Sequence, residues 1–405
     1  MSIFRDVEEA SPIEVFHLMK IFSEDDYPTK VNLTVGAYRT DEGKPYYIPV
    51  VKKAEKLVLE STTNHEYLPI FGLESFTKAA SQLLLGDIVQ RQEEGSIFGV
   101  QSLSGSGALR VGAEFLAKHL KCTTFYYSLP TWENHHLIFM NSGFNDAKTY
   151  RYWNEEKRSL DCDGFFEDLS NAPENSVIIL HGCAHNPTGL DPTKDQWKQI
   201  AEIMKERKLI PFFDNAYQGF ASGDVEKDAW SVRYFLSQGF EFLCSQSFAK
   251  NYGLYNERAG NLTFVLNSTD NVKAVKSQVT MIVRGMYSNP PNHGARTVST
   301  ILNNPELKEE WLDTLKIMTG RIKDMRKALR ENLEQLGTIG KWNHITDQTG
   351  MFSYTGLSAN HVEYLRKKYH IYMLRSGRIN ICGLTNNNIN YVAEAITDAL
   401  VTVTI

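Results

Sequence analysis

The sequence has no apolar run that approaches the roughly 18 residues of a membrane-spanning helix. Its first residues, MSIFRDVEEASP, hold one arginine among three acidic residues. A mitochondrial transit peptide is instead rich in arginine and poor in acids. The last four residues, TVTI, are not a peroxisomal address. These absences predict a cytoplasmic protein that binds no membrane.

Cysteine is scarce, with five residues in all and none in CxxC spacing. An odd, scattered set argues against a disulfide framework and fits a reducing compartment. Neither sign of charge is in large excess, because 43 Lys and Arg residues face 48 Asp and Glu residues. The net charge of -5 gives no reason to expect nucleic acid as a partner. The 405 residues, without repeats, predict two or three domains around a large core.

Two common glycine-rich nucleotide motifs are also missing. The stretch QSLSGSGALR at 101–110 has two close glycines, but Arg110 stands where a dinucleotide fingerprint needs a third. No Gly-Lys-Ser/Thr of a Walker loop follows. A helix is expected over 108–120, and small residues before it leave N–H groups free for an anion. Ser104 and Ser106 add hydroxyl donors, although an ordinary capped helix remains an alternative for this segment alone.

Between about 120 and 245, apolar runs alternate with helical patterns. This alternation predicts βαβ units and a mostly parallel sheet. The expected strands are Thr123–Tyr127, Ser176–His181, Leu209–Asp214 and Phe240–Cys244. A polar motif follows each run, and ligands of such sheets bind at the carboxyl ends of strands. These motifs are Pro130-Thr131-Trp132, Asn186-Pro187-Thr188-Gly189, Asp214-x-x-Tyr217 and the stretch around Lys250.

Other patterns lie on either side of this region. Helices are expected over 12–20, 50–62, 73–92, 272–301 with an interruption at 289–291, 305–336, 358–369 and 387–401. Strands are expected over 31–35, 97–100, 350–355 and 371–374.

Lys250 lies between Ser247 and Arg258 in the stretch SQSFAKNYGLYNERAGNLTFV. A lysine amine can form a Schiff base with an aldehyde cofactor. A hydroxyl and a guanidinium nearby suit a phosphate on that cofactor. The run from Ser247 to Arg258 closely resembles the cofactor-lysine segment of aspartate aminotransferases, which are pyridoxal-phosphate enzymes of fold-type I. The resemblance extends from about the tenth residue to the C-terminus and is closest to the animal cytosolic form.

The resemblance implies an α/β fold and a homodimer with shared active sites. The large domain would hold a mostly parallel seven-stranded sheet, and a smaller α+β domain would be built from both chain ends. We expect residues 1–45 to form an N-terminal arm and part of the small domain. Residues 46–310 would form the large cofactor-binding domain, and residues 311–405 the rest of the small domain.

Five residues would act at the cofactor ring. Asp214 ends an apolar run, and its carboxylate would keep a pyridine nitrogen protonated, although aspartate is also a common helix N-cap. Tyr217 and Asn186 would donate to the ring oxygen. Trp132 would stack on the ring or simply pack in the core. Lys250, once displaced by the substrate amine, would act as general base and acid.

The phosphate group of the cofactor would be held by residues from both subunits. The resemblance to aspartate aminotransferases implies this role for Ser104, Gly105, Ser106, Ser247, Arg258 and, from the other subunit, Tyr67. Plain packing is the alternative for Tyr67.

The substrate would be held mainly by two arginines. Arg378 matches the family residue that binds the α-carboxylate as a bidentate pair. Arg284 matches the residue that reaches across the dimer to the distal carboxylate, which would select dicarboxylates. Surface ion pairs are the alternative for both arginines. The family pattern adds Gly36, Trp132 and Asn186 to the substrate site, and a simple turn is the alternative for Gly36.

The segment His181-Gly182-Cys183-Ala184-His185 suggests a metal site, because residues two apart on a strand share a face. No fourth ligand is near, so we expect no metal and assign these residues to the surroundings of the ring. His135 matches the family histidine that braces the aspartate at position 214.

Three positions depart from the family pattern. Ala249 replaces a serine, which removes one hydroxyl beside the phosphate. Tyr287 replaces a tryptophan common in the animal cytosolic form. Leu374-Arg375 stands where a proline is common and adds a charge near the substrate clamp.

The implied reaction is reversible transfer of the amino group of L-aspartate to 2-oxoglutarate, giving oxaloacetate and L-glutamate. The substrates would be small dicarboxylic amino acids and 2-oxo acids. One alternative is a noncatalytic protein that binds pyridoxal phosphate. The other is an aminotransferase with a shifted preference for aromatic amino acids or cysteine sulfinate.

Overall fold

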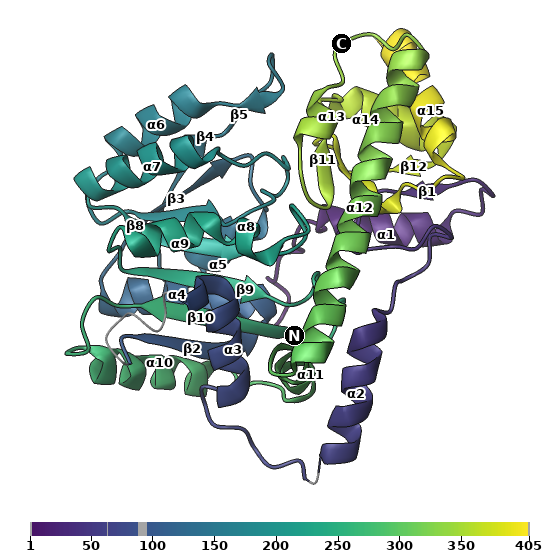
Figure 1. The fold of residues 1–405 in the computed structure, drawn as a ribbon. Helices are drawn as coiled ribbons and strands as arrows, with labels where there is room; N and C mark the ends of the chain where they lie inside the picture. Colours follow the sequence, from purple (N-terminus) through teal and green to yellow (C-terminus); the bar gives the residue numbers. More distant parts are fainter. Residues whose placement is uncertain (1, 63, 88–94, 404–405) are drawn as a thin grey trace.

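The computed structural model describes residues 2–62, 64–87 and 95–403. Its centre is a seven-stranded sheet with the strand order β2-β10-β9-β8-β7-β3-β4 (Figure 1). Strand β10 is antiparallel to both its neighbours, and the other pairs are parallel. This confirms the expected α/β fold. The strands are β2 (Ile97–Leu103), β3 (Thr124–Leu129), β4 (Asp146–Arg151), β7 (Val177–His181), β8 (Ile210–Asn215), β9 (Phe242–Ser247) and β10 (Ala259–Val265).

The inner strands are buried on both faces, as expected for a sheet covered by helices on both sides. Adjacent residues of β8 show the two faces, because Phe212 packs in one apolar cluster and Phe213 in another. The first cluster includes residues of α4 (Ser104–His119), α5 (Asn134–Met140) and α10 (Val272–Met286). The second includes residues of α3 (Glu74–Leu85), α6 (Cys162–Asn171), α7 (Lys194–Glu206) and α9 (Trp230–Ser237).

The two ends of the chain meet beside this sheet. Strand β1 pairs in parallel with β12, so Val31 lies opposite Ile371. Figure 1 shows the purple N-terminal segment beside the yellow C-terminal one, with the long helix α12 running along them. The elements here are α1 (Glu14–Glu24), β1 (Val31–Asn32), α12 (Pro305–Gln335), α13 (His344–Asp347), β11 (Phe352–Tyr354), α14 (Ala359–Tyr369), β12 (Ile371–Tyr372), β13 (Arg378–Asn380), η2 (Ile381–Gly383) and α15 (Ile389–Thr402).

The remaining elements connect these two regions or decorate the sheet. They are α2 (Pro49–Ser61), β5 (Trp153–Asn154), β6 (Ser159–Leu160), α8 (Val225–Asp228) and α11 (His293–Leu302). The expected domain boundary at 310 falls within α12, and the division of the chain at 45 and 310 stays a prediction.

Most elements lie where the sequence predicts them, with shifted ends. The expected interruption at 289–291 separates α10 from α11. Helix α4 begins at Ser104 and not at the expected position 108, because Ser104 to Gly107 form its first turn. The helix expected over 73–92 covers Glu74–Leu85, and its last expected residues, 88–92, lie outside the described residues. Among the described residues, no helix has the length and apolar character that a membrane crossing requires.

Candidate active site

A cavity of about 420 Å³ lies where the carboxyl ends of several strands meet. The turns after β3, β7, β8 and β9 all contribute side chains to it, as expected for a parallel sheet. Twelve of the fourteen residues predicted for the site line this one cavity. They are Gly36, Ser104, Gly105, Ser106, Trp132, Asn186, Asp214, Tyr217, Ser247, Lys250, Arg258 and Arg378.

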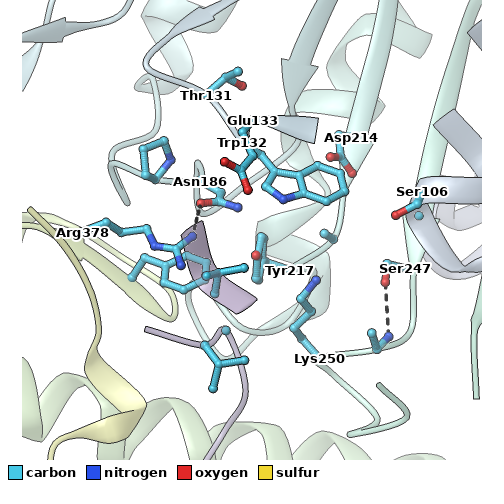
Figure 2. Close-up of a pocket in the computed structure, with 18 of the residues that line it drawn as sticks. Ser106, Thr131, Trp132, Glu133, Asn186, Asp214, Tyr217, Ser247, Lys250 and Arg378 are labelled. Atoms are coloured by element: carbon cyan, nitrogen blue, oxygen red, sulfur yellow. Dashed lines mark hydrogen bonds between the residues drawn. The ribbon is translucent and has the colours of Figure 1, made fainter. Parts of the chain in front are cut away.

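The cavity has two chemically distinct ends. Figure 2 shows Ser247 on one side, Arg378 on the opposite side, and Lys250 with Trp132 between them. A flat, charged molecule held at both ends would therefore lie across the lysine.

Lys250 follows the end of β9 and points its amino group into the cavity (Figure 2). The nitrogen lies 5.2 Å from the centre of the Tyr217 ring. Burial lowers the pKa of Lys250 to about 8, and the positive charges of Arg258 and Arg378 act in the same direction, while Asp214 opposes them. A lysine with this pKa has an appreciable neutral fraction near pH 7, which is the nucleophilic form.

Asp214 lies on β8 with its carboxylate at the cavity wall. Burial alone would raise its pKa. The hydrogen bond from His135, with Nε2 2.9 Å from Oδ2, and the nearby positive charge of Lys250 outweigh burial, so the pKa of Asp214 is lowered. The predicted contact between His135 and Asp214 is therefore present. Asp214 does not cap a helix.

A chain of hydrogen bonds continues from His135 away from the carboxylate. The Thr131 hydroxyl lies 2.9 Å from His135 Nδ1 and 3.2 Å from His181 Nε2. The backbone N–H of Asn186 donates to His181 Nδ1, which makes Nε2 the protonated nitrogen of a neutral His181. His181 Nε2–H then donates to the Thr131 hydroxyl, and that hydroxyl donates to His135 Nδ1. The proton of His135 is therefore on Nε2, which donates to Asp214. Burial, followed by repulsion from His185, lowers the pKa of His181 well below its usual value, which keeps this ring neutral.

The premise of the metal reading was wrong. Strand β7 ends at His181, so Cys183 and His185 lie in the following loop and do not share a strand face with it. His185 bonds instead to the hydroxyls of Ser128 and Thr188. No group of three or more His, Cys, Asp or Glu side chains with metal-site geometry occurs in the described parts of the chain.

The start of α4 and the Lys250 segment form an anion cradle. The Ser104 and Ser247 hydroxyls lie 2.9 Å apart, and the Ser104 N–H donates to the Arg258 carbonyl. Gly260 lets β10 approach this point closely, because a Cβ there would lie 2.4 Å from the Ser104 carbonyl carbon. Free N–H groups at the helix start, hydroxyls and the Arg258 guanidinium fit a phosphate. Together with Lys250 and Asp214, these residues fit pyridoxal phosphate.

Arg378 lies on β13 and is buried, yet it has no ion-pair partner among the described residues. One NH group donates to the Thr34 carbonyl at 2.7 Å, and the other to Asn186 Oδ1 at 3.3 Å. The guanidinium lies 4.1 Å from the centre of the Phe352 ring, and its Nε has no hydrogen-bond partner in the described parts of the chain. Burial lowers the pKa of Arg378 to about 10, so it remains charged at neutral pH. A buried, unpaired guanidinium at a cavity wall suits a carboxylate ligand.

Two predicted residues do not line this cavity. The Tyr67 residue is 87% exposed, which rules out core packing within this chain. Arg284 is exposed near the end of α10 and donates to the Ser288 hydroxyl. The positions of Tyr67 and Arg284 in a single chain do not test their predicted roles, because both residues are expected to act on the other subunit.

The sequence interpretation missed the cavity residues contributed by α1. Glu14, Val15 and Phe16 line the cavity, as do Glu133 and Phe352. Phe16 lies on an amphipathic helix yet is 65% exposed, and nothing in its local pattern distinguishes it from a surface residue. These contributions arise from the meeting of distant segments.

The structure also locates the departures from the family pattern. Ala249 lines the cavity, so a hydroxyl on this residue would enter it. Leu374 and Ser376 line the cavity, whereas the Arg375 side chain is exposed and only its backbone N–H bonds to Glu14.

Comparisons with known proteins agree with this geometry. The family model for class I and II aminotransferases matches residues 28–396. The chain is 56% identical to the cytoplasmic aspartate aminotransferase of Gallus gallus, over 98% of both chains. The aspartate aminotransferase from Saccharomyces cerevisiae cytoplasm superposes with a TM-score of 0.96, with 44% identity and 99% of each chain covered.

A further solved structure carries the cofactor. The aromatic-amino-acid aminotransferase from Burkholderia pseudomallei, covalently bound to pyridoxal phosphate, has a TM-score of 0.95 and 38% identity, with 99% of this chain and 100% of that chain covered. The family model matches most of the chain, relatives match over almost their whole length, and the cavity suits an aldehyde that carries a phosphate. The chain therefore belongs to the class I and II aminotransferases.

Proposed function

We propose that this protein is a cytoplasmic aspartate aminotransferase that uses pyridoxal phosphate. It transfers the amino group of L-aspartate reversibly to 2-oxoglutarate, giving oxaloacetate and L-glutamate. The observation that carries the proposal is the placement of Lys250 between an ionised Asp214 and the unpaired Arg378. The curated relatives of Gallus gallus and Caenorhabditis elegans, at 56% and 51% identity, are both cytoplasmic aspartate aminotransferases.

The bound cofactor supplies a conjugated ring that withdraws electrons from the substrate carbon. Asp214 would keep the ring nitrogen protonated, since a nearby negative charge favours the protonated form. Tyr217 and Asn186 line the cavity close to Lys250 and would orient the ring oxygen of the cofactor. Trp132 would present a flat face to the ring, and the phosphate would be held by Ser104, Gly105, Ser106, Ser247 and Arg258, which all line the cavity.

Lys250 moves the proton. Its amino group is neutral in part at pH 7, so Nζ of Lys250 could accept a proton from the α-carbon of the substrate, hold it, and later return it as a general acid. Asp214 and Arg378 are themselves buried, and the low polarity around them strengthens their electrostatic effects.

Substrate selection rests on two guanidinium groups. Arg378 binds the α-carboxylate, assisted by Asn186 and by the Gly36 backbone. Arg284 of one subunit binds the distal carboxylate in the other subunit's cavity, and Tyr67 reaches the phosphate there. The exposure of both residues on this chain supports a homodimer with shared sites. An uncharged substrate side chain would leave the Arg284 guanidinium without a partner.

The test is to load the purified protein with pyridoxal phosphate and mix it with L-aspartate and 2-oxoglutarate. We expect oxaloacetate and L-glutamate to form, and the visible absorption band to shift when aspartate alone is added. A protein that binds the cofactor but neither shifts its band nor turns over would be the noncatalytic alternative. Lys250→Ala should abolish turnover, and a surviving rate would contradict the role of Lys250.

A shifted substrate preference is the second candidate. Two solved aromatic-amino-acid aminotransferases share this fold at 38% and 35% identity. Leu374, which departs from the family pattern, lines the cavity beside Arg378. A panel of aspartate, glutamate, cysteine sulfinate, phenylalanine and tyrosine decides between the two. Higher kcat/KM for the aromatic substrates than for aspartate would favour the second candidate.

A further inference from the structure

Gln101 lies on the edge strand β2 and is fully buried. All four of its backbone and side-chain polar groups bond to two segments that are distant in sequence. The backbone N–H donates to the Phe71 carbonyl at 3.0 Å, and Oε1 accepts from the Leu73 N–H at 2.9 Å. On the other side, Nε2 donates to the Pro291 carbonyl at 2.6 Å, and the Tyr287 hydroxyl lies 3.3 Å from the Gln101 carbonyl oxygen.

The two segments held in this way are those that carry Tyr67 and Arg284. Phe71 lies four residues after Tyr67, and Tyr287 lies three residues after Arg284. Figure 1 shows β2 and α10 at the same end of the large sheet, with the connection from α2 to α3 passing nearby. A strand edge has unpaired backbone groups, and here Gln101 uses its own groups to fix both segments.

The packing around Gln101 leaves little room for adjustment. Gly72 has a φ of +84°, and a Cβ on it would lie 2.3 Å from both Cβ and Oε1 of Gln101. The loop therefore presses its backbone directly on the glutamine side chain. Removing the amide would leave the Leu73 N–H and the Pro291 carbonyl without these partners.

We propose that Gln101 is a positioning residue that sets the placement of Tyr67 and Arg284 together, and so acts on the active site of the other subunit. This inference rests on the proposed function, in which both residues complete the partner's site. A displacement of about 1 Å in a group that orients a substrate lowers the rate by about a hundredfold. Loss of the Gln101 amide therefore weakens catalysis in the neighbouring subunit. In the altered subunit itself, Lys250, Asp214 and Arg378 stay in place.

The test uses hybrid dimers purified through two different affinity tags. In the first hybrid, a Gln101→Met chain is paired with a Lys250→Ala chain. The one competent lysine then lies in the Gln101→Met subunit, whose partner has an intact Gln101. We expect about half the activity of the unmodified dimer, with unchanged KM for aspartate.

In the second hybrid, one chain carries both Gln101→Met and Lys250→Ala, and its partner is unmodified. The competent lysine now receives Tyr67 and Arg284 from the altered chain. We expect kcat/KM for aspartate to fall by about tenfold to a hundredfold relative to the first hybrid, and pyridoxal phosphate to dissociate faster. Equal activities in the two hybrids, or a larger loss in the first, would overturn the inference.

Two controls separate this inference from its premise. A Lys250→Ala chain paired with an Arg284→Asp chain tests shared sites without altering Gln101. If that pair is inactive while the unmodified dimer turns over, shared sites are wrong and the inference falls with them. Gln246→Met is the matched control, because Gln246 is a buried glutamine on β9 that donates to the Ala80 carbonyl. Any loss it causes should stay in its own subunit.

A second variant covers the case in which Gln101→Met does not fold. Gln101→Glu keeps an acceptor for the Leu73 N–H but, once ionised, loses the donor to the Pro291 carbonyl. It should raise the KM for aspartate in the partner's site as pH rises and leave the affinity for pyridoxal phosphate less affected. A pH-independent KM equal to that of the unmodified dimer would also overturn the inference.

Discussion

At the scale of single residues, reactivity is set by what surrounds each side chain. Lys250 is one of many lysines, but burial and two arginines make its amine easier to deprotonate than a surface amine. Asp214 is ionised although buried, because His135 donates to it. Lys250 is thus neutral more often, and Asp214 is ionised more readily, than the same groups are in water.

The lowered pKa of Lys250 predicts how cofactor attachment depends on pH. The neutral amine attacks an aldehyde, and below a pKa of about 8 its fraction falls about tenfold for each pH unit. We expect cofactor-free protein to react with pyridoxal phosphate progressively faster from pH 6 to pH 8 and to level off above that. Stopped-flow absorbance measures the rate, with Lys250→Ala as the control for surface lysines. A rate that keeps rising to pH 10 would contradict the lowered pKa.

Replacing Ala249 with the serine of the family pattern is expected to tighten the binding of pyridoxal phosphate. Ala249→Ser places a hydroxyl in the cavity beside Ser247. One added hydrogen bond to the phosphate contributes about 0.5–1.5 kcal/mol, so the dissociation constant of pyridoxal phosphate should fall by about twofold to tenfold. Equilibrium dialysis measures it. Ser358→Ala, which removes the cap of α14, is a control that should change stability but not cofactor affinity.

Residues that follow apolar runs were predictable. Asp214 lies near the end of the buried strand β8, and Lys250 follows the end of the buried strand β9 by three residues. Parallel strands bring such groups to one edge of the sheet. Phe352 and Glu14 were not predictable, since they reach the cavity only because distant segments pack together. The role of Thr131 between two histidines depends on side-chain geometry that spacing does not specify.

At the scale of elements, the site is built from strand ends and one helix start. The sequence SGSG has low helix propensity, so the predicted start of α4 was too late. In the structure, contacts with Arg258 and Ser247 place Ser104 at the helix start. Strand β4 was not predicted individually, because it is an edge strand in which only Tyr150 is fully buried.

The close approach of β10 to α4 predicts that a side chain at Gly260 would lower both the stability of the protein and its affinity for the cofactor. Gly260→Ala would place a Cβ 2.4 Å from the Ser104 carbonyl carbon. Overpacking of this kind costs about 1–3 kcal/mol, and the shift of Ser104 should also weaken binding of pyridoxal phosphate. Gly320→Ala in α12 is the matched change, since no neighbouring atom lies within 4 Å of its Cβ.

Gly320→Ala should raise the free energy of unfolding by about 1 kcal/mol through helix propensity alone. Urea unfolding and cofactor titration of both variants make the comparison. Equal cofactor affinities in the two variants would show that the contact with Ser104 does not shape the cradle.

At the scale of the whole molecule, one chain lines most of the proposed site, and the proposed dimer would supply the remaining residues from a second chain. In the proposed function Arg378 binds one carboxylate, while Arg284 and Tyr67 are exposed and do not line this cavity. The sequence predicted this division only through the family resemblance, because no local pattern tells a residue that serves its own subunit from one that serves another.

Arg284→Asp should therefore act selectively. We expect kcat/KM for aspartate and glutamate to fall by about a hundredfold or more, because a buried carboxylate would lose its partner and meet a like charge. Phenylalanine should lose much less. Steady-state kinetics with each substrate provide the measurement, and Lys273→Asp, at the exposed start of the same helix α10, is the matched control. Equal losses for aspartate and phenylalanine would contradict the clamp.

The pairing of β1 with β12 has a consequence for biosynthesis. Val31 emerges from the ribosome early, but its partner Ile371 is translated near the end. The central sheet, by contrast, is complete once β10 has been made. A nascent chain can therefore contain every strand of the central sheet while β1 still lacks its partner, which becomes available only after Ile371 has left the ribosome.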